Sequence, residues 1–145
     1  MNAIIISLHF NPGHVSHMVA SYKQCQEIGY EPMYYVTKEF KKFLPTDANI
    51  IFNGDTLPQV TLAIITFSSP KDLLLITKLK KQNAKIIFIF HEPLAPLRIY
   101  KNAGFSLAYI IKLWIGDKIS ALTVKWSDVI LIPSKKAIKF YRENK

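Results

Sequence analysis

This sequence is poor in cysteine and glycine, and the shortage of each excludes some classes of protein. Cys25 is the only cysteine among 145 residues, so a disulfide framework and a thiolate metal site are both excluded, as expected for a reducing compartment. The dinucleotide pattern G-x-G-x-x-G and the P-loop pattern G-x-x-x-x-G-K-[ST] do not occur, and neither does the G-x-S-x-G elbow of serine hydrolases. An NAD-dependent enzyme, a P-loop NTPase and a serine hydrolase are therefore disfavoured.

Acidic residues are also scarce. Lys and Arg number 19 against 10 Asp and Glu, which gives a net charge of +9. This charge favours anionic partners, namely nucleic acid, nucleotide-activated substrates or an anionic membrane surface. The net charge alone does not indicate which of these partners is bound. No predicted strand ends in the clustered carboxylates that a Mg²⁺ site or a phospho-acceptor domain needs.

Long apolar runs are missing as well. No stretch approaches the roughly 20 apolar residues that span a bilayer. The first apolar run, residues 2–8, has no preceding Lys or Arg and is short, which is typical of a strand rather than a signal peptide. Half of the residues are hydrophobic, so residues 1–145 are expected to form one domain with a real core.

Strand-like and helix-like segments alternate along the whole chain. Strands are expected at residues 2–8, 31–37, 49–52, 60–67, 86–90 and 128–132. Helices are expected at residues 15–28, 38–44, 71–82 and 105–127, with a closing helix after Pro133. This order predicts an α/β fold of the Rossmann-like kind, a parallel sheet with helices on both faces.

The helical periodicity also predicts which side chains face the core. The expected inward positions are Val15, Met18, Val19, Tyr22, Cys25 and Ile28 in the first helix and Leu74, Leu75 and Leu79 in the third. For the long helix they are Ala108, Ile111, Ile115, Ile119, Leu122 and Trp126, with Lys112, Gly116, Ser120 and Thr123 on the other face.

The run at residues 86–90 predicts a central strand buried on both faces, and it ends at His91, Glu92 and Pro93. Ligands of open α/β sheets bind just beyond the carboxyl ends of such strands. His91 is therefore expected to contact a ligand, although a purely structural histidine is the alternative. Glu92 either orients His91 or binds a substrate hydroxyl, or it caps the segment that follows.

Three further histidines lie in or near the loop after the first strand. His9, His14 and His17 are dense enough to raise the question of a metal, but no acidic or thiolate ligand is near them in the sequence. We therefore expect no metal, and we expect His17 to cap or pack at the start of its helix.

Basic residues surround the long helix, at Arg98, Lys101, Lys112, Lys118 and Lys125. With Tyr100, Tyr109 and Trp114 among them, they could form a face for an anionic membrane or for nucleic acid. A solvated charged surface is the more common reason for such a pattern.

Several segments resemble a known family. Residues 12–17 (P-G-H-V-S-H), the following helix and Gly29-Tyr30 are similar to the opening of GT-B glycosyltransferases, in particular the retaining family that includes the mannosyltransferases of lipid glycosylation. That family has G-G-x-x-x-H here, and Pro12 stands where its first glycine would be. His91-Glu92-Pro93 resembles its H-E-P turn, and residues 126–134 resemble the stretch that closes its N-terminal domain. The resemblance covers essentially the whole chain.

The resemblance implies that this chain is the acceptor-binding, N-terminal domain of an enzyme that uses a nucleotide-sugar donor and no other cofactor. The acceptor would be a glycan or a lipid-linked molecule, as in polysaccharide biosynthesis, at the cytoplasmic face of the membrane. His91 would be catalytic, and Asn11, Gly13, His14 and Glu92 would line the cleft for acceptor and donor. The family's donor-binding domain does not occur within residues 1–145, so this chain alone is expected to be inactive.

Two alternatives to this interpretation stay open. The chain could be one subunit of a split, two-chain glycosyltransferase, whose partner binds the donor. It could also be a basic, flavodoxin-like module that binds nucleotide or nucleic acid without catalysis, although we regard nucleic acid as the less favoured partner.

Overall fold

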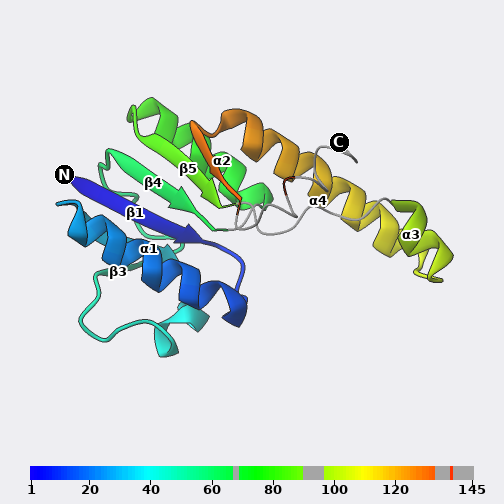
Figure 1. Ribbon diagram of the computed structural model, residues 1–145, viewed down its shortest axis with the longest axis horizontal. Coiled ribbons are helices and arrows are strands. Elements are labelled where there is room, and N and C mark those ends of the chain that lie inside the picture. Colours follow the sequence, from blue (N-terminus) through cyan, green and yellow to red (C-terminus); the bar gives the residue numbers. More distant parts are fainter. Residues whose placement is uncertain (67–68, 90–96, 133–137, 139–145) are drawn as a thin grey trace.

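The computed structural model describes residues 1–66, 69–89, 97–132 and 138. Its centre is a six-stranded sheet in the order β3-β2-β1-β4-β5-β6, and every pair of neighbouring strands is parallel (Figure 1). The strands are β1 (Asn2–Ser7), β2 (Glu31–Val36), β3 (Ile50–Phe52), β4 (Leu62–Ile65), β5 (Lys85–Ile89) and β6 (Val129–Leu131). The predicted Rossmann-like α/β fold is confirmed, because this is the doubly wound strand order.

The helices alternate with these strands. They are η1 (Pro12–His14), α1 (Val15–Glu27), η2 (Lys38–Lys42), α2 (Pro70–Lys81), α3 (Leu97–Asn102) and α4 (Leu107–Trp126). The segment expected as a helix at residues 38–44 is a short 3₁₀ helix. α3 was not expected, because its segment follows two closely spaced prolines, Pro93 and Pro96. The closing helix expected after Pro133 lies outside the described residues.

The sheet has a separate apolar cluster on each face. On the α1 face, Ala3 and Ile5 of β1 pack with Met18 and Cys25 of α1. On the other face, Ile4 and Ile6 of the same strand pack with Leu75, Ile76 and Leu79 of α2. Successive side chains of a strand point to opposite faces, so a strand such as β1 needs an unbroken apolar run when helices cover both sides.

The strand at residues 86–90 is not central, contrary to expectation. β5 lies between β4 and the edge strand β6, and β1 and β4 form the middle of the sheet. Ile86 and Phe88 of β5 are buried, whereas Ile87 is only partly buried. An apolar run indicates helices on both faces, but it does not distinguish a central strand from one next to the edge.

Two predicted inward positions on the shorter helices are wrong. Leu74 is 70% exposed and Ile28 is 65% exposed. In α2 the buried face is formed by Leu75, Ile76 and Leu79, and Leu74 lies beside it. Ile28 comes after the last residue of α1, where Gly29 turns the chain toward β2. Gly29 has a φ of +82°, a left-handed conformation that glycine adopts without strain.

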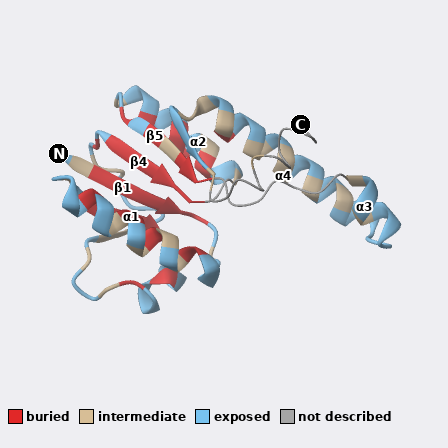
Figure 2. Cartoon of the chain, in the orientation of Figure 1, coloured by how far each residue is buried: buried red, intermediate tan, exposed pale blue. Residues whose placement is uncertain are grey.

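The long helix α4 shows the largest disagreement, because much of the side that was expected to point inward is exposed, although Trp126 packs against the core as expected. Ile111, Ile115 and Leu122 were expected to point inward, yet each is exposed, while Thr123 on the supposed outer face is fully buried. Most of α4 is exposed or partly buried (Figure 2). The carboxyl-terminal part of α4 packs on the sheet through Val124 and Trp126, and the rest extends past the sheet to α3 (Figure 1). None of the helices within the described ranges combines the length and the apolar character needed to cross a membrane.

Candidate functional site

The candidate site lies where the strand order reverses, at the carboxyl ends of β1 and β4. From β1 the chain first adds β2 and β3 on one side and then places β4, β5 and β6 on the other. The connection after β1 leads to α1 on one face of the sheet, and the connection after β4 leads to α2 on the other. Connections that separate in this way leave a crevice between them, which is the usual ligand site in this class of fold.

The turn after β1 brings together three residues that the sequence predicted for the site. The backbone N–H of Gly13 donates to Asn11 Oδ1 at 2.9 Å, and the N–H of His14 donates to the Asn11 carbonyl at 3.0 Å. Asn11 thus caps η1, and Pro12 follows at the first position of the turn, where no N–H is needed. A Cβ on residue 13 would lie 3.2 Å from Asn11 Oδ1, so glycine permits this close approach.

The same turn leaves few backbone donors for a ligand. The N–H of Val15 donates to the Pro12 carbonyl, so the N–H groups of residues 13, 14 and 15 all have partners inside the turn. Asn11 and Gly13 are exposed, whereas His14 is 7% exposed and lies beneath them. The turn therefore presents an amide side chain to solvent and is poorly suited to hold a phosphate on its backbone.

His9 and His17 do not join this turn in a ligand set. His9 is exposed, and its carbonyl accepts from the Ser7 hydroxyl at 3.4 Å, while His17 is partly buried on α1. Across the described parts of the chain, no three His, Cys, Asp or Glu side chains lie close enough together to hold a metal ion.

The connection after β4 supplies residues that the sequence analysis missed. Thr66 is fully buried, and both its N–H and its hydroxyl donate to the Ile6 carbonyl, at 3.1 and 3.0 Å, which ties the end of β4 to β1. Ser69 precedes α2, and its N–H donates to Asp72 Oδ2 at 2.8 Å. The Ser69 hydroxyl also donates to that oxygen. The spacing Ser69-x-x-Asp72 is a helix-capping signal that could have located both residues.

Asp72 is the most perturbed acid of the described residues. Its side chain is fully buried, and desolvation raises its pKa to about 6, although the hydrogen bonds from Ser69 and the charge of Lys71 oppose the shift. Oδ2 accepts from Ser69, whereas the buried Oδ1 has no hydrogen-bond partner within the described ranges. A carboxyl group that titrates near neutral pH is thus present close to the strand-order reversal.

Two predicted site residues lie outside the described part of the chain. β5 is described as far as Ile89, and neither the predicted catalytic residue His91 nor its neighbour Glu92 is described. Their assignment stays a prediction from the sequence.

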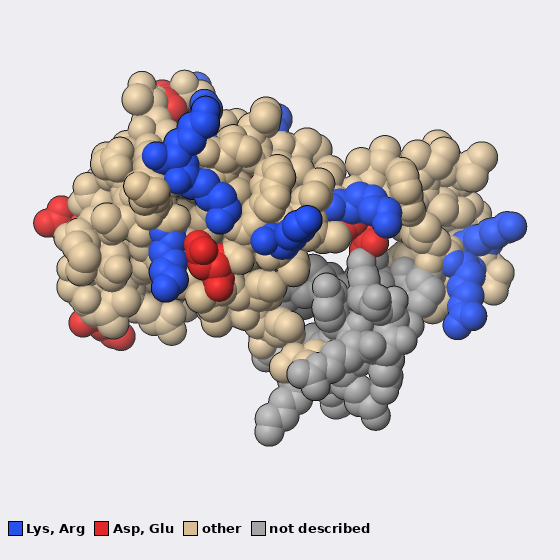
Figure 3. All heavy atoms as spheres, turned by 90° about the horizontal axis from the view of Figure 1, so that it is seen from above, with Lys and Arg blue, Asp and Glu red and all other residues tan. Residues whose placement is uncertain are grey.

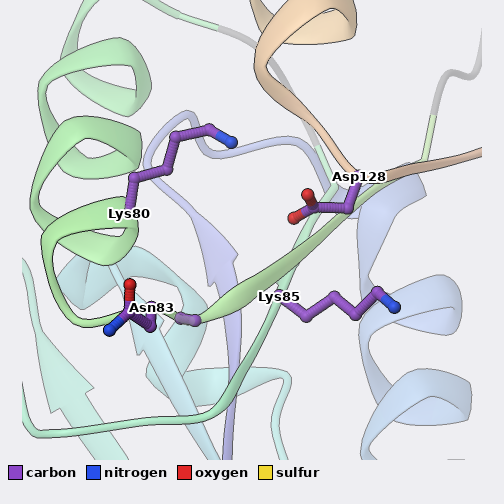
Figure 4. A pocket seen from close by; sticks show the side chains of 5 residues that line it. Lys80, Asn83, Lys85 and Asp128 are labelled. Carbon is purple, nitrogen blue, oxygen red and sulfur yellow. The ribbon is translucent and has the colours of Figure 1, made fainter.

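A polar pocket of about 370 Å³ lies at the opposite, amino-terminal edge of the sheet. It is lined by Lys80, Asn83, Ala84, Lys85 and Asp128. In Figure 4 the side chains of Lys80 and Asp128 point toward one another, whereas Lys85 is directed away. Asp128 Oδ2 accepts from the Ile86 N–H at 2.7 Å, so this carboxylate fixes the start of β6 beside β5. The hydrogen bond from Ile86 thus gives Asp128 a structural role. The pocket lies at the amino-terminal edge of the sheet, whereas α/β sheets bind ligands at the carboxyl-terminal edge.

Comparisons with family models, with curated proteins and with solved structures found no match to this chain.

Proposed function

We propose that this chain is the acceptor-binding domain of a glycosyltransferase that transfers a sugar from a nucleotide-sugar donor to a glycan or a lipid-linked acceptor. The proposal rests on the turn at the carboxyl end of β1. Asn11 is exposed there, and the N–H groups of residues 13 to 15 are used inside the turn.

This turn favours a neutral ligand over a phosphate. Proteins that bind a dinucleotide at this place aim free backbone N–H groups and the start of the next helix at the pyrophosphate. Here Pro12 has no N–H, and the next three N–H groups already have acceptors. An exposed carboxamide is well suited to sugar hydroxyls, because it both donates and accepts hydrogen bonds.

The chemical step is assigned from the sequence resemblance. His91 would lie beside the transferred sugar, where a compact polar group stabilises the charge that develops as the glycosyl bond breaks. The nucleotide-sugar would be held by a second Rossmann-like domain or by a partner subunit. Residues 1–145 alone should then bind acceptor and give no turnover, and sugar transfer by the purified chain would contradict this division of roles.

Acceptor binding can be measured by calorimetry with a panel of soluble oligosaccharides. Asn11→Asp keeps an oxygen to accept from Gly13 but removes the amide donor, so we expect the affinity for the acceptor to fall roughly five- to tenfold. Asn102→Ala, at an exposed asparagine of α3, is the matched control and should bind like the unchanged chain.

The proposal fails if no oligosaccharide binds while single-stranded nucleic acid does, with an affinity that depends on salt and on the lysines. That result would favour a nucleic-acid module. Equal effects of Asn11→Asp and Asn102→Ala on oligosaccharide binding would also contradict a role for the turn.

A further inference from the structure

The segment from α3 to α4, residues 97–126, forms an arm that extends beyond the sheet (Figure 1). Large apolar side chains on α4 are exposed, among them Leu107, which is 73% exposed, and Trp114, which is 50% exposed. Ile111, Ile115 and Leu122 are exposed as well. These five residues recur at intervals of three, four and seven, so they form one stripe along the helix, which we call the outer stripe.

The inner face of α4 has the opposite character. Gly116, Ser120 and Thr123 lie opposite the outer stripe, and each is partly or fully buried. A helix that serves only to cover a protein core buries its apolar side and exposes its polar side. The arrangement on α4 leaves several large apolar side chains exposed along one side of the helix, and clusters of this kind mark contacts with another molecule or with a membrane.

Lysines interrupt the outer stripe, and they bear on the choice of partner. Lys118 and Lys125 fall within the stripe by helical spacing, and Lys118 Nζ lies 5.7 Å from the centre of the Trp114 ring. A protein partner would have to bury these ammonium groups and supply a carboxylate for each. At a bilayer the long lysine side chains reach the lipid phosphates while their carbon chains stay among apolar groups.

The charge of the arm points to the same partner. Residues 97–126 contain five basic residues, Arg98, Lys101, Lys112, Lys118 and Lys125, against the single acid Asp117, a net charge of +4. Basic side chains are visible along the arm and at its far end in Figure 3. Anionic lipids attract basic side chains near the membrane surface, and Trp side chains such as Trp114 are enriched at the interface.

A hollow between α3 and α4 extends this surface. Its volume is about 380 Å³, and its lining combines Leu97, Phe105, Leu107 and Ile110 with Arg98 and Lys101. Apolar walls beside two cations suit the junction of an acyl chain with a phosphate group.

We infer that the α3–α4 arm binds an anionic phospholipid membrane, with α4 lying in the plane of the interface and its outer stripe toward the acyl chains. This inference is independent of the glycosyltransferase proposal, because it concerns a different surface and its test requires no sugar transfer.

Vesicle flotation of the 145-residue chain tests the inference. We expect binding to vesicles of phosphatidylcholine with phosphatidylglycerol, little binding to phosphatidylcholine alone, and weaker binding as salt is raised. Binding should also shift the fluorescence of Trp114 to shorter wavelength, and Trp114→Phe should remove most of the shift.

Variants of exposed apolar side chains show whether vesicle binding depends on the outer stripe or on any exposed apolar residue. The double variant Ile111→Ser/Ile115→Ser changes two exposed residues and should bind anionic vesicles roughly tenfold or more weakly. Leu74→Ser removes an even more exposed apolar side chain, which belongs to α2 and not to the outer stripe, and should leave vesicle binding unchanged. Far-ultraviolet circular dichroism confirms that each variant is folded.

Charge reversals provide the second pair of variants. Lys118→Glu/Lys125→Glu should weaken binding to anionic vesicles at least about fivefold for each lysine. Lys80→Glu/Lys81→Glu makes the same change of net charge on α2 and should have a much smaller effect.

Three results would overturn the inference. One is equal binding to neutral and anionic vesicles, and another is equal loss of binding for the arm variants and their α2 controls. The third is self-association of the chain, seen by sedimentation, that the Ile111→Ser/Ile115→Ser variant abolishes without any vesicle binding by the unchanged chain. That last result would assign the outer stripe to a second copy of this chain.

Discussion

Asp72 combines a structural role with an unusual pKa. Its Oδ2 accepts from the Ser69 N–H at the start of α2, and burial of the carboxyl group raises its pKa from the ordinary value of 3.8 to about 6. The folded protein therefore binds this proton more tightly than the unfolded chain does. The stability that comes from the protonated form is fully present below about pH 4 and is lost as the pH rises through about 6.

We predict that Asp72→Asn removes this dependence on pH. Asparagine keeps an oxygen to accept from the Ser69 N–H and carries no charge. The free energy of unfolding of the variant, relative to the unchanged chain, should rise by on the order of 2–3 kcal/mol between pH 4 and pH 7.5. Urea denaturation of both proteins across that range measures the difference, and a difference that does not change with pH would contradict the assignment.

Tyr34 and Tyr35 are adjacent in β2 and differ in what their hydroxyl groups contact. The buried Tyr34 hydroxyl has no hydrogen-bond partner among the described groups, and its ring stacks on Tyr22 with centroids 4.6 Å apart. The Tyr35 hydroxyl accepts from the Gly54 N–H and donates to the Asp55 carbonyl, both at 3.4 Å.

The same substitution should therefore have opposite effects at the two positions. Tyr34→Phe keeps the stacked ring and removes a buried group that lacks a partner, so it should stabilise the fold by about 1 kcal/mol. Tyr35→Phe loses two hydrogen bonds and should destabilise it by about 1 kcal/mol. Thermal unfolding of the two variants decides the matter, and a loss of stability in Tyr34→Phe would show that its hydroxyl has a partner.

At the scale of elements, α2 and α4 show what periodicity can and cannot predict. In both helices the apolar spacing predicts a helix, and in both the helix exists. The core face of α2 was predicted correctly at Leu75 and Leu79, whereas Ile111, Ile115 and Leu122 of α4 face solvent. Periodicity shows that one side of a helix is apolar, but it does not show whether that side meets the core or another molecule.

The exposed side of α4 predicts different costs for the same substitution in two helices. Ile76 of α2 is fully buried, and Ile76→Ala should cost about 2–5 kcal/mol, because it leaves a cavity. Ile115 of α4 is half-exposed, and Ile115→Ala should change stability by less than about 1 kcal/mol, since alanine also favours the helix. Chemical denaturation measures the free energy of unfolding of both variants. A loss of stability in Ile115→Ala as large as that in Ile76→Ala would show that Ile115 points inward, as the sequence predicted.

At the scale of the whole molecule, the fold could be predicted and much of the site could not. The alternation of apolar runs and amphipathic segments predicts a doubly wound sheet, and the sheet order confirms it. Asn11, Gly13 and His14 were predicted for the site from the family resemblance, and they lie together in one turn after β1, while their role in binding stays a prediction. Thr66 and Asp72 were missed, because their importance depends on burial and on the approach of β4 to β1, which connects residues about 60 positions apart.

The two proposed surfaces lie on different parts of the molecule. The turn after β1 belongs to the carboxyl edge of the sheet, while the outer stripe of α4 lies on the arm. A membrane-bound arm would suit a lipid-linked acceptor, and an acceptor site without membrane binding would suit a soluble glycan. The oligosaccharide-binding experiment and the vesicle-binding experiment therefore have independent outcomes.

Binding of an acceptor at the carboxyl edge of the sheet can be tested by a nuclear magnetic resonance titration of the isotopically labelled chain. With an oligosaccharide that binds, we expect shifts of backbone amide signals in residues 8–14 and 69–72, and no shifts in residues 80–85. A nucleotide-sugar alone should cause no comparable change. Shifts confined to residues 80–85 and Asp128 would contradict acceptor binding at the carboxyl edge of the sheet. Larger shifts with the nucleotide-sugar than with every oligosaccharide would contradict it as well.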